Sequence, residues 1–253
     1  MKIALIHQLN KINARFYQLT ATEFSKTRSF YWQGWKNLLP FIQPLAKEKT
    51  PFKVLDVGCG NGRFGEFLFR QKISKKLIYH GLDNSQELLN FAQQRLEPLK
   101  FEKEFMTIDL VESLLHQTLS EEIPYKKYHL TTLFGVLHHI PSQKLRQELV
   151  QLLGNSLVSG GFLVLTAWRF LNEKRFEKKQ IHSSIVQIDP EELEKNDYIL
   201  DWQQGRTAYR YCHYTDEQEM KKLINNSGLK LVQEYVADGK SENLNHYVVL
   251  RKT

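Results

Sequence analysis

The stretch VLDVGCGNGRFGEF, residues 54–67, begins with apolar residues that predict a buried β-strand and continues into a glycine-rich loop. Residues 60–65 match the G-x-G-x-x-G pattern of dinucleotide-binding loops, in which backbone N–H groups meet a pyrophosphate. Asp56, however, precedes the loop, and a carboxylate there would repel that pyrophosphate. We therefore treat the match as a coincidence and expect a cationic ligand, bound by the pattern D-x-G-x-G-x-G. Its glycines are Gly58, Gly60 and Gly62.

From residue 53 onward, apolar runs of strand length alternate with helical patterns. The expected strands are 53–57, 76–82, 104–109, 128–134, 161–168, 230–236 and 245–252, and the expected helices are 62–71, 85–97 with Ser85 as N-cap, about 111–119, 142–154 and 216–227. This alternation predicts an α/β fold with a doubly wound, mostly parallel sheet. Because only a short segment separates the last two strands, we expect a hairpin in which one strand is antiparallel.

Two stretches fall outside this alternation. Residues 8–45 have the pattern of two helices, and residues 169–215 form a polar insertion of mixed charge after the fifth strand. In open α/β sheets, ligands lie beyond the carboxyl ends of the strands, where such segments can cover the site. We therefore expect residues 1–50 to be a helical, basic cover and residues 51–253 to be a ligand-binding domain with a substrate-facing insertion.

The positive charge of the chain is concentrated at its start. Residues 1–53 hold nine Lys and Arg against two Glu, an excess of seven that equals the net charge of the whole chain. Aromatic residues are interleaved with these charges, among them Phe16, Tyr17, Phe24, Phe30, Tyr31, Trp32 and Trp35. A basic, aromatic segment suits a polyanion with exposed bases, but packing between helices explains the same composition. Both interpretations stay open.

The composition is that of a folded globular protein, with 42% hydrophobic and 25% charged residues. The first apolar run is too short for a secretory signal, and FLVLTAW (162–168) has the length of a strand, so we expect no membrane-spanning helix. Two distant cysteines offer neither a disulfide framework nor a metal-binding cluster. We therefore expect a cytoplasmic protein without a metal.

Two further aspartates stand where neighbouring strands end. Asp83 ends the second strand, 21 residues after Gly62, and Asp109 ends the third. S-adenosylmethionine carries a sulfonium and an ammonium and has no phosphates, so Asp56 suits it. Asp83 can then bind the ribose hydroxyls, as it also would in NAD, and Asp109 lies within reach of the adenine amine. Each aspartate alone is more simply a turn or cap residue, but three at consecutive strand ends predict S-adenosylmethionine as cofactor and S-adenosylhomocysteine as product.

The segment LFGVLHHIPSQKLRQ (133–147) follows the fourth strand, where acceptor chemistry is expected. It lacks a [DN]-P-P-[FY] element and the chain has no Pro-Cys pair, which disfavours transfer to nitrogen and to a pyrimidine carbon. An oxygen acceptor is the simplest remaining choice. Adjacent histidines on an extended segment point in opposite directions, so His138 and His139 should not share a metal. We expect one to pack in the core and favour His139 for the site.

The glycine loop and the three aspartates resemble those of class I S-adenosylmethionine-dependent methyltransferases, over roughly residues 50–253. The resemblance implies a seven-stranded, Rossmann-like sheet with an antiparallel last strand. It also implies that the glycines line the methionyl end of the cofactor, Asp83 its ribose and Asp109 its adenine.

A second resemblance spans nearly the whole chain. FYQLTATEFSKTRSFYWQGW (16–35), the segment 135–168 and DYILDWQQGRTAYRYCHYTDEQEMKKL (197–223) are similar to tRNA methyltransferases that esterify the carboxymethyl group on a wobble uridine. The resemblance implies tRNA as the substrate. It also raises the question of a small zinc-binding activator subunit, which eukaryotic relatives use.

A carboxylate acceptor is already anionic at neutral pH, so it needs an orienting cation more than a strong base. Arg28 offers a planar fork suited to bidentate binding of a carboxylate, and His139 can donate a hydrogen bond or hold the uridine. The residues expected to contact tRNA or to close the site are Trp32, Arg210, Tyr211 and His213.

Three functions remain open from the sequence. The first is O-methylation of a wobble-uridine carboxylate or a related tRNA oxygen. The second is O-methylation of a small-molecule carboxylate or hydroxyl, for which the basic N-terminal segment would be incidental. The third is a non-catalytic RNA-binding protein that uses S-adenosylmethionine as a structural ligand or sensor.

Overall fold

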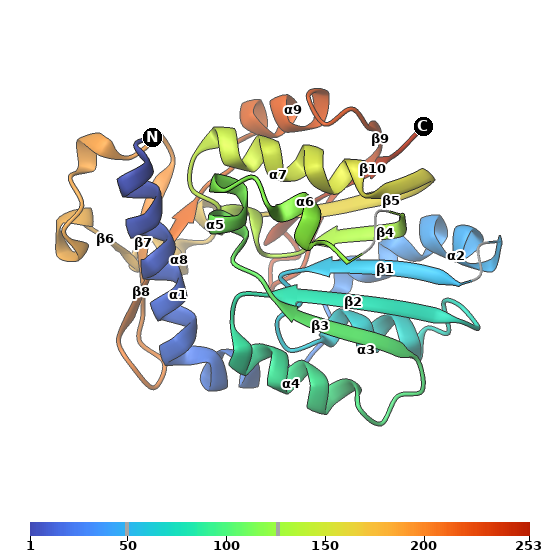
Figure 1. The fold of residues 1–253 in the computed structure, drawn as a ribbon. Coiled ribbons are helices and arrows are strands. Elements are labelled where there is room, and N and C mark those ends of the chain that lie inside the picture. The colour runs from blue at the N-terminus through green and yellow to red at the C-terminus, as the bar shows by residue number, and fades with distance from the viewer. Residues whose placement is uncertain (49–50, 125–126) are drawn as a thin grey trace.

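The computed structural model describes residues 1–48, 51–124 and 127–253. Its centre is a seven-stranded sheet of order β3-β2-β1-β4-β5-β10-β9 (Figure 1). The strands are β1 (Phe52–Val57), β2 (Leu77–Asp83), β3 (Glu102–Thr107), β4 (Tyr128–Leu133), β5 (Leu157–Trp168), β9 (Lys230–Ala237) and β10 (Asn245–Arg251). Neighbours from β3 to β5 pair in parallel, whereas β10 is antiparallel to both β5 and β9. The doubly wound sheet, its seven strands and the terminal hairpin are thus confirmed.

Helices cover both faces of this sheet. On one face lie α5 (Leu110–Leu115), α6 (Leu119–Glu122), α7 (Gln143–Asn155) and α9 (Glu217–Asn225), and on the other lie the 3-10 helix η1 (Gln33–Leu38), α2 (Leu39–Glu48), α3 (Arg63–Arg70) and α4 (Gln86–Leu96). The expected cap of α4 is present, since the Leu88 N–H donates to Ser85 Oγ over 3.3 Å. The single helix expected over 111–119 is wrong: Gln117 has a φ of +60°, which ends α5 before α6 begins.

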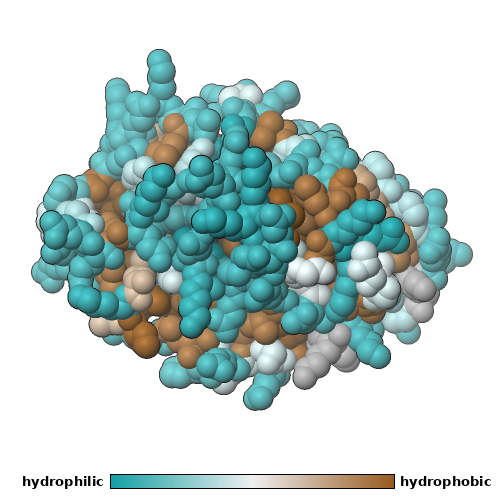
Figure 2. Space-filling view, turned by 90° about the horizontal axis from the view of Figure 1, so that it is seen from above, coloured by the Kyte–Doolittle hydropathy of each residue, from teal (hydrophilic) through white to brown (hydrophobic). Residues whose placement is uncertain are grey.

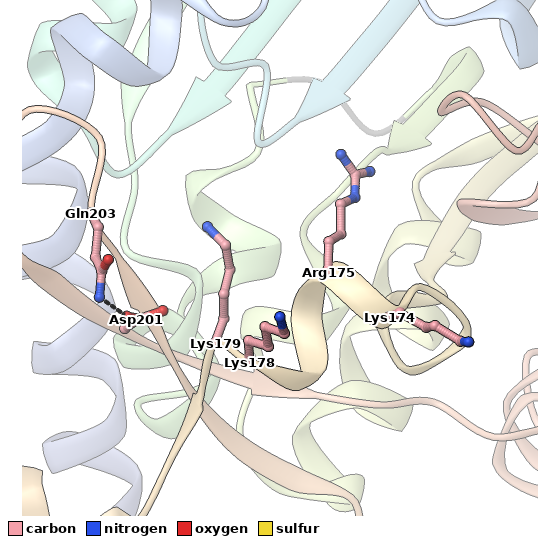
Figure 3. A pocket seen from close by; sticks show the side chains of 6 residues that line it. All are labelled: Lys174, Arg175, Lys178, Lys179, Asp201 and Gln203. Atoms are coloured by element: carbon pink, nitrogen blue, oxygen red, sulfur yellow. Dashed lines mark hydrogen bonds between the residues drawn. The ribbon is translucent and has the colours of Figure 1, made fainter.

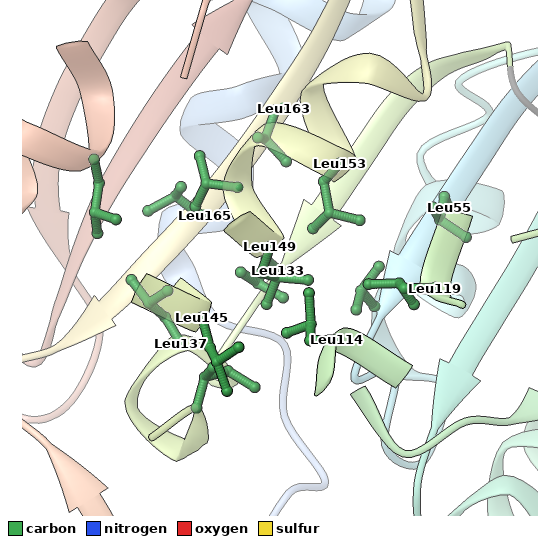
Figure 4. Packing of buried hydrophobic residues seen from close by; sticks show 14 of the residues in the cluster. Leu55, Leu114, Leu119, Leu133, Leu137, Leu145, Leu149, Leu153, Leu163 and Leu165 are labelled. Atoms are coloured by element: carbon green, nitrogen blue, oxygen red, sulfur yellow. The ribbon is translucent and has the colours of Figure 1, made fainter. Parts of the chain in front are cut away.

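The larger apolar core lies between α7 and the centre of the sheet (Figure 4). Leu149 and Leu153 of α7 are fully buried and belong to the same cluster as Leu133 of β4 and Leu163 and Leu165 of β5. The strands bury nearly every side chain in this region, as expected for a parallel sheet covered on both faces.

The N-terminal segment forms two α-helices, as predicted, although the first is longer than expected. This helix, α1 (Ile3–Lys26), is followed by η1 and α2. The predicted domain boundary at residue 50 and Lys49, one of the nine basic residues, lie outside the described residues. The division into a cover and a separate domain stays a prediction.

The insertion folds into a second sheet, which the sequence did not predict. Its antiparallel strands are β6 (Gln180–Ile181), β7 (Asp197–Trp202) and β8 (Ala208–His213), in that order. Two short helices, η3 (Phe170–Asn172) and α8 (Lys174–Glu177), precede β6, and two more, η4 (Ser183–Val186) and η5 (Pro190–Glu192), lie between β6 and β7. Helix α1 lies along β8, where Leu5 and Leu9 pack with Ile199 and Tyr211, so the N-terminal cover and the insertion form one layer beside the main sheet (Figure 1).

In the part of the chain that the structure describes, no helix is long and apolar enough to cross a membrane. The surface seen from above, on the side of α7 and α9, is mostly hydrophilic, with apolar residues showing between the polar ones (Figure 2).

Replacing Leu149 by alanine tests the importance of the core below α7. The side chain is fully buried, so Leu149→Ala should lower the free energy of unfolding by about 2–5 kcal/mol, through lost burial and the cavity left behind. Leu231→Ala on the outer strand β9, where the side chain is 39% exposed, should cost much less. Urea denaturation of both variants measures the difference, and equal losses would contradict this account of the core.

Candidate active site

The glycine loop lies between β1 and α3, at the carboxyl end of the central strand. Gly58, Gly60 and Gly62 have φ values of +72°, +55° and +76°, which disfavour any other residue. An ideal Cβ on Gly58 would lie 2.1 Å from Val136, whereas one on Gly60 would meet nothing within 4 Å. The loop is therefore packed on one side and has open space at Gly60, where a ligand can approach the backbone.

Gly65, the last glycine of the literal G-x-G-x-x-G match, has a different environment. It lies inside α3, where a Cβ would come within 3.0 Å of Tyr79 and of Leu96. This glycine allows helix α3 to pack closely on β2 and α4.

Asp83 ends β2 and faces the glycine loop. Its Oδ2 accepts the Gly60 N–H over 2.9 Å, and its Oδ1 accepts the Ser85 N–H over 2.9 Å. Burial raises the pKa of Asp83, although these hydrogen bonds oppose the shift. Each oxygen keeps acceptor capacity beyond these bonds, which is what a pair of ribose hydroxyls requires. The ribose contact itself stays a prediction.

Asp56 is buried, with 2% of its surface exposed. Tyr79 donates to Oδ2 over 2.6 Å from β2, and Thr132 donates to Oδ1 over 2.7 Å from β4. Burial raises the pKa of Asp56 to about 6 despite the two bonds. The carboxylate thus joins the three central strands next to the loop, and a direct contact with the cofactor stays a prediction.

Asp109 follows β3 and caps α5. Its Oδ1 accepts the backbone N–H groups of Val111 and Glu112 over 3.0 and 3.2 Å. The amide of Asn10 on α1 donates to both carboxylate oxygens, over 3.0 and 2.8 Å. Asp109 is therefore a point where the N-terminal helix attaches to the main sheet, and its contact with adenine stays a prediction.

Arg28 lies just after α1, with its guanidinium packed on the Phe24 ring, 3.6 Å from Cζ to the ring centroid. One Nη1–H donates to Thr27 Oγ1 over 2.6 Å. Burial and the neighbouring charge of Arg210 lower the pKa of Arg28 to about 9, so it is still cationic at neutral pH. Within the described residues, no carboxylate forms an ion pair with Arg28.

Arg210 on β8 is 5% exposed and is surrounded by aromatic rings. Its Cζ lies 4.7 Å from the ring centroid of Trp168, 5.3 Å from that of Phe16 and 5.8 Å from that of Trp202. Its Nε has no hydrogen-bond partner, and the described part of the chain offers it no ion pair. Rings stabilise a cation less than a carboxylate does, so two neighbouring arginines that lack acidic partners among the described residues keep positive charge that the protein does not neutralise.

The paired histidines lie near these arginines, in the 3-10 helix η2 (Leu137–His139). Their ring centroids are only 4.1 Å apart. The expectation that they point in opposite directions is therefore wrong, because the segment is a helical turn and not an extended one. His138 is buried against Trp168, 5.0 Å between ring centroids, and its Nδ1 has no hydrogen-bond partner among the described residues.

Both ring nitrogens of His139 are hydrogen-bonded within the protein. Nδ1 donates to the Tyr211 carbonyl over 3.0 Å, so Nε2 is the acceptor for the Tyr17 hydroxyl, also over 3.0 Å. Burial, together with Arg210, lowers the pKa of His139 to about 3, so the ring is neutral. In this arrangement His139 orients Tyr17 and has no N–H left for a substrate.

Strand alternation separates the residues proposed on β8. Arg210 and Cys212 lie on one face, and Tyr211 and His213 lie on the other. Tyr211 donates to Asp197 over 2.7 Å, and His213 bonds Asp197 over 2.7 Å and Glu219 over 2.6 Å. Although burial alone would lower it, these hydrogen bonds raise the pKa of His213. The structure thus brings Arg210 to Arg28 but directs Tyr211 and His213 elsewhere.

Trp32 lies over the carboxyl end of β4. A Cβ on Gly135 would be 3.3 Å from its ring, and its ring centroid lies 5.6 Å from that of Trp35 and 6.2 Å from that of Phe134. Arg63 of α3 packs near it, with Cζ 5.7 Å from the centroid. Its contact with substrate stays a prediction.

The segment that carries Arg28 is fastened to the glycine loop. Asn61 Nδ2 donates to Ser25 Oγ over 3.0 Å and to the Arg28 carbonyl over 3.3 Å. Arg63 Nη1 donates to the Phe30 carbonyl over 2.6 Å. These bonds place the proposed acceptor cation beside the proposed cofactor loop.

Two groups of side chains bring three potential metal ligands within 4.8 Å of one another: His138 with His139 and Cys212, and Glu194 with Asp197 and His213. Beside the first group, the charges of the two arginines oppose a cation. In the second group, His213 already bonds two carboxylates. Charge therefore disfavours a cation at the first group, and contacts within the protein account for the second.

Residues 28–234 match the family model of a methyltransferase domain, which is well over half of the chain. The chain belongs to this methyltransferase family. Two solved structures of S-adenosylmethionine-dependent methyltransferases share its fold. The one from Clostridium acetobutylicum has a TM-score of 0.63 at 11% identity, over 94% of this chain and 98% of that one. The magnesium protoporphyrin IX methyltransferase of Synechocystis PCC 6803, with bound cofactor, has a TM-score of 0.58 at 16% identity, over 96% and 97%.

Three curated relatives of this methyltransferase are similar at low identity. The tRNA (carboxymethyluridine(34)-5-O)-methyltransferase ALKBH8 of Mus musculus is 26% identical over 70% of this chain and 23% of its own length. The tRNA (carboxymethyluridine(34)-5-O)-methyltransferase of Schizosaccharomyces pombe is 23% identical over 88% and 91%. The mitochondrial ubiquinone biosynthesis O-methyltransferase of Candida albicans is 29% identical over 53% and 39%. The chain thus spans less than a third of the mouse relative's length.

The family model gives this chain a methyltransferase domain, and solved methyltransferases whose cofactor is S-adenosylmethionine share its fold. The site fits that cofactor, because Gly60 leaves open space at the loop and Asp83 has free acceptor capacity beside it.

Sequence reasoning missed three residues of α1 that contact the site. Asn10 donates to Asp109, and the Tyr17 hydroxyl is hydrogen-bonded to His139. Asn13 makes two contacts: its Nδ2 donates to the His139 carbonyl over 3.3 Å, and its Oδ1 accepts the Tyr211 N–H over 2.8 Å. All three lie on the face of α1 that carries buried apolar residues. Polar residues at positions i, i+3 and i+7 on an apolar helix face were the available signal.

Replacing Asp83 tests the cofactor assignment. Asp83→Asn keeps the shape but removes the negative charge, so the dissociation constant for S-adenosylmethionine should rise by about tenfold to a hundredfold. Asp189→Asn, at an exposed position in the insertion, is the matched control and should bind like the wild type. Titration calorimetry decides, and unchanged affinity in Asp83→Asn would remove Asp83 from the ribose site.

The burial of Asp56 predicts a pH dependence of stability. In the unfolded chain its carboxyl loses the proton near pH 4, but in the folded protein its pKa is about 6, so the folded state binds more protons between these values. Its contribution should therefore lower the free energy of unfolding by up to about 3 kcal/mol as pH rises from 4 to 6. The difference between wild type and Asp56→Asn, measured by urea denaturation at several pH values, should follow this slope. A constant difference would contradict it.

Proposed function

We propose that this methyltransferase esterifies the carboxylate of a carboxymethyl-type modified wobble uridine in tRNA. The observation that carries the proposal is the pair formed by Arg28 and Arg210, two cations that approach each other without an acidic partner in the described chain. Like charges repel, and burial costs each of them solvation. An anionic acceptor would relieve both costs, and a carboxylate matches the planar fork of an arginine.

The neighbouring side chains favour an acceptor that needs no base. Burial raises the pKa of Tyr17 and lowers the pKa values of His138 and His139, so none of the three is suited to remove a proton at neutral pH. A hydroxyl acceptor would need such a base. A carboxylate is already ionised and needs only to be held in place.

Different residues of this chain would then bind the cofactor and orient the acceptor. Asp83 would hold the ribose, the glycine loop the methionyl portion and Asp109 the adenine. Bound S-adenosylmethionine supplies a methyl group on a positively charged sulfur, which departs as the thioether of S-adenosylhomocysteine. Arg28 and Arg210 orient the acceptor carboxylate, and His139 acts as a positioning residue by holding the Tyr17 hydroxyl.

One exposed aromatic residue favours a nucleic acid over a free metabolite. Among the seven aromatic residues of positions 16–35, Phe30 is 83% exposed, whereas the others are buried or partly buried against neighbouring rings. It stands two residues from Arg28, and Lys26 is exposed nearby. A free ring beside cations suits stacking on a nucleobase. Packing accounts for the other six.

A small-molecule carboxylate or hydroxyl is the second candidate acceptor. The near-complete burial of Arg210 favours a small group there, and the similarity to the Candida O-methyltransferase points the same way. A non-catalytic, RNA-binding role, a small activator subunit and a cytoplasmic location also stay predictions from the sequence.

Transfer of labelled methyl groups separates these candidates. With tRNA from a strain lacking this methyltransferase, label should appear in an esterified carboxymethyl uridine identified by nucleoside mass spectrometry. Arg28→Ala should lower kcat/KM by about a hundredfold or more with unchanged affinity for S-adenosylmethionine, and Arg28→Lys should restore part of the loss. Arg15→Ala, at an exposed position on α1, is the matched control. Label that enters a metabolite extract and never tRNA would establish the second candidate instead.

A further inference from the structure

Four cationic side chains cluster at helix α8 in the insertion. Lys174 and Arg175 lie on α8, and Lys178 and Lys179 follow at its end, around a hollow of about 590 Å3 that Asp201 and Gln203 of the β7 end also line. Figure 3 shows Arg175 and Lys179 extending in the same direction, with Lys178 between them and the hydrogen-bonded pair of Asp201 and Gln203 at the far side.

This cluster is poorly neutralised by the protein itself. Arg175 lies 3.4 Å from Glu173, but within the described ranges the three lysines have no ion pair. Asp201 turns one carboxylate oxygen to the Gln203 amide over 2.6 Å, and its other oxygen is buried. The hollow therefore presents several positive charges to solvent, and it suits a ligand with more than one negative charge.

The cluster is held close to the proposed acceptor site. Phe176 of α8 is buried and packs edge-on against Trp168, 4.8 Å between ring centroids, and Trp168 also contacts Arg210. The Asp201 N–H donates to the Lys179 carbonyl over 2.8 Å, which fastens the end of α8 to β7. Trp202 contacts both cations, with Lys179 Nζ 5.9 Å and Arg210 Cζ 5.8 Å from its ring centroid.

We propose that the α8 cluster binds backbone phosphates of the RNA whose modified uridine enters the site at Arg28 and Arg210, an inference that rests on the proposed function. A polynucleotide places regularly spaced negative charges on either side of the acceptor nucleotide. The α8 cluster can receive these charges, because the ring of Trp202 lies close to both Lys179 of the cluster and Arg210 of the proposed acceptor site. A lipid surface is a poorer match, because membrane-binding segments also expose apolar side chains and the apolar residue of α8, Phe176, is buried.

Neutralising the lysines tests the proposal. In the triple variant Lys174→Gln, Lys178→Gln, Lys179→Gln, the dissociation constant for a fluorescent anticodon stem-loop RNA should rise by about tenfold or more at low salt. The slope of log Kd against log salt concentration should fall in magnitude by about 2, because each lost phosphate contact on single-stranded RNA contributes about 0.7. Affinity for S-adenosylmethionine and turnover at saturating RNA should stay at wild-type values.

The matched control removes the same charge elsewhere: Lys221→Gln, Lys222→Gln, Lys230→Gln, at exposed positions on α9 and β9. It should keep the wild-type affinity and salt slope. A triple α8 variant that binds RNA like the wild type would overturn the inference, as would wild-type binding to phosphatidylserine vesicles that is lost in the variant while RNA binding is kept.

The same measurements separate this inference from the proposed function. If the wild type methylates tRNA and the α8 variant binds it equally well, the proposed function stands and the inference fails. If RNA binding depends on α8 but label enters only small carboxylates, the inference stands and the proposed acceptor fails.

Discussion

The buried carboxylate of Asp56 holds together the three strand ends on which the site is built. It accepts one hydrogen bond from β2, through Tyr79, and one from β4, through Thr132. The glycine loop, Asp83 and the turn with the two histidines all begin within a few residues of these bonds. Leaving either partner without its acceptor inside the core would cost about 1–3 kcal/mol. The position of the glycine loop relative to the turn with the two histidines therefore depends on Asp56, a residue that is itself buried.

A second constraint is the outer edge of the insertion sheet. Strand β8 would present unpaired backbone groups there, and such edges invite pairing with other chains. Asn13 of α1 accepts the Tyr211 N–H, and His139 Nδ1 donates to the Tyr211 carbonyl. The N-terminal helix and the histidine turn thus provide hydrogen-bond partners for the Tyr211 backbone groups at this edge. One strand then serves two purposes: its backbone and the Tyr211 side chain secure the cover, and Arg210 on its other face supplies the cation of the site.

The main sheet was predictable because each of its strands is an apolar run between helical patterns. The aspartates at the strand ends predict a cofactor site there, and that assignment stays a prediction. The insertion sheet was not predictable, because the insertion as a whole is polar and of mixed charge, and residues such as His213 find their partners, Asp197 and Glu219, only in three dimensions. For the same reason Arg210, Tyr211 and His213 looked equivalent until strand alternation separated them. The histidine pair was misjudged because no residue pattern around positions 137–139 indicates a 3-10 turn. Asn10, Asn13 and Tyr17 were missed because their partners are distant along the chain.

The hydrogen bonds from Asn61 to Ser25 and to the Arg28 carbonyl have a thermodynamic consequence. They join the loop proposed for the cofactor to the backbone of the residue proposed for the acceptor, so an adjustment of either segment is transmitted to the other. Free energies of binding at joined sites are coupled, and the coupling is reciprocal. Occupation of the glycine loop should therefore change the affinity for the acceptor by the same factor by which the acceptor changes the affinity for the cofactor.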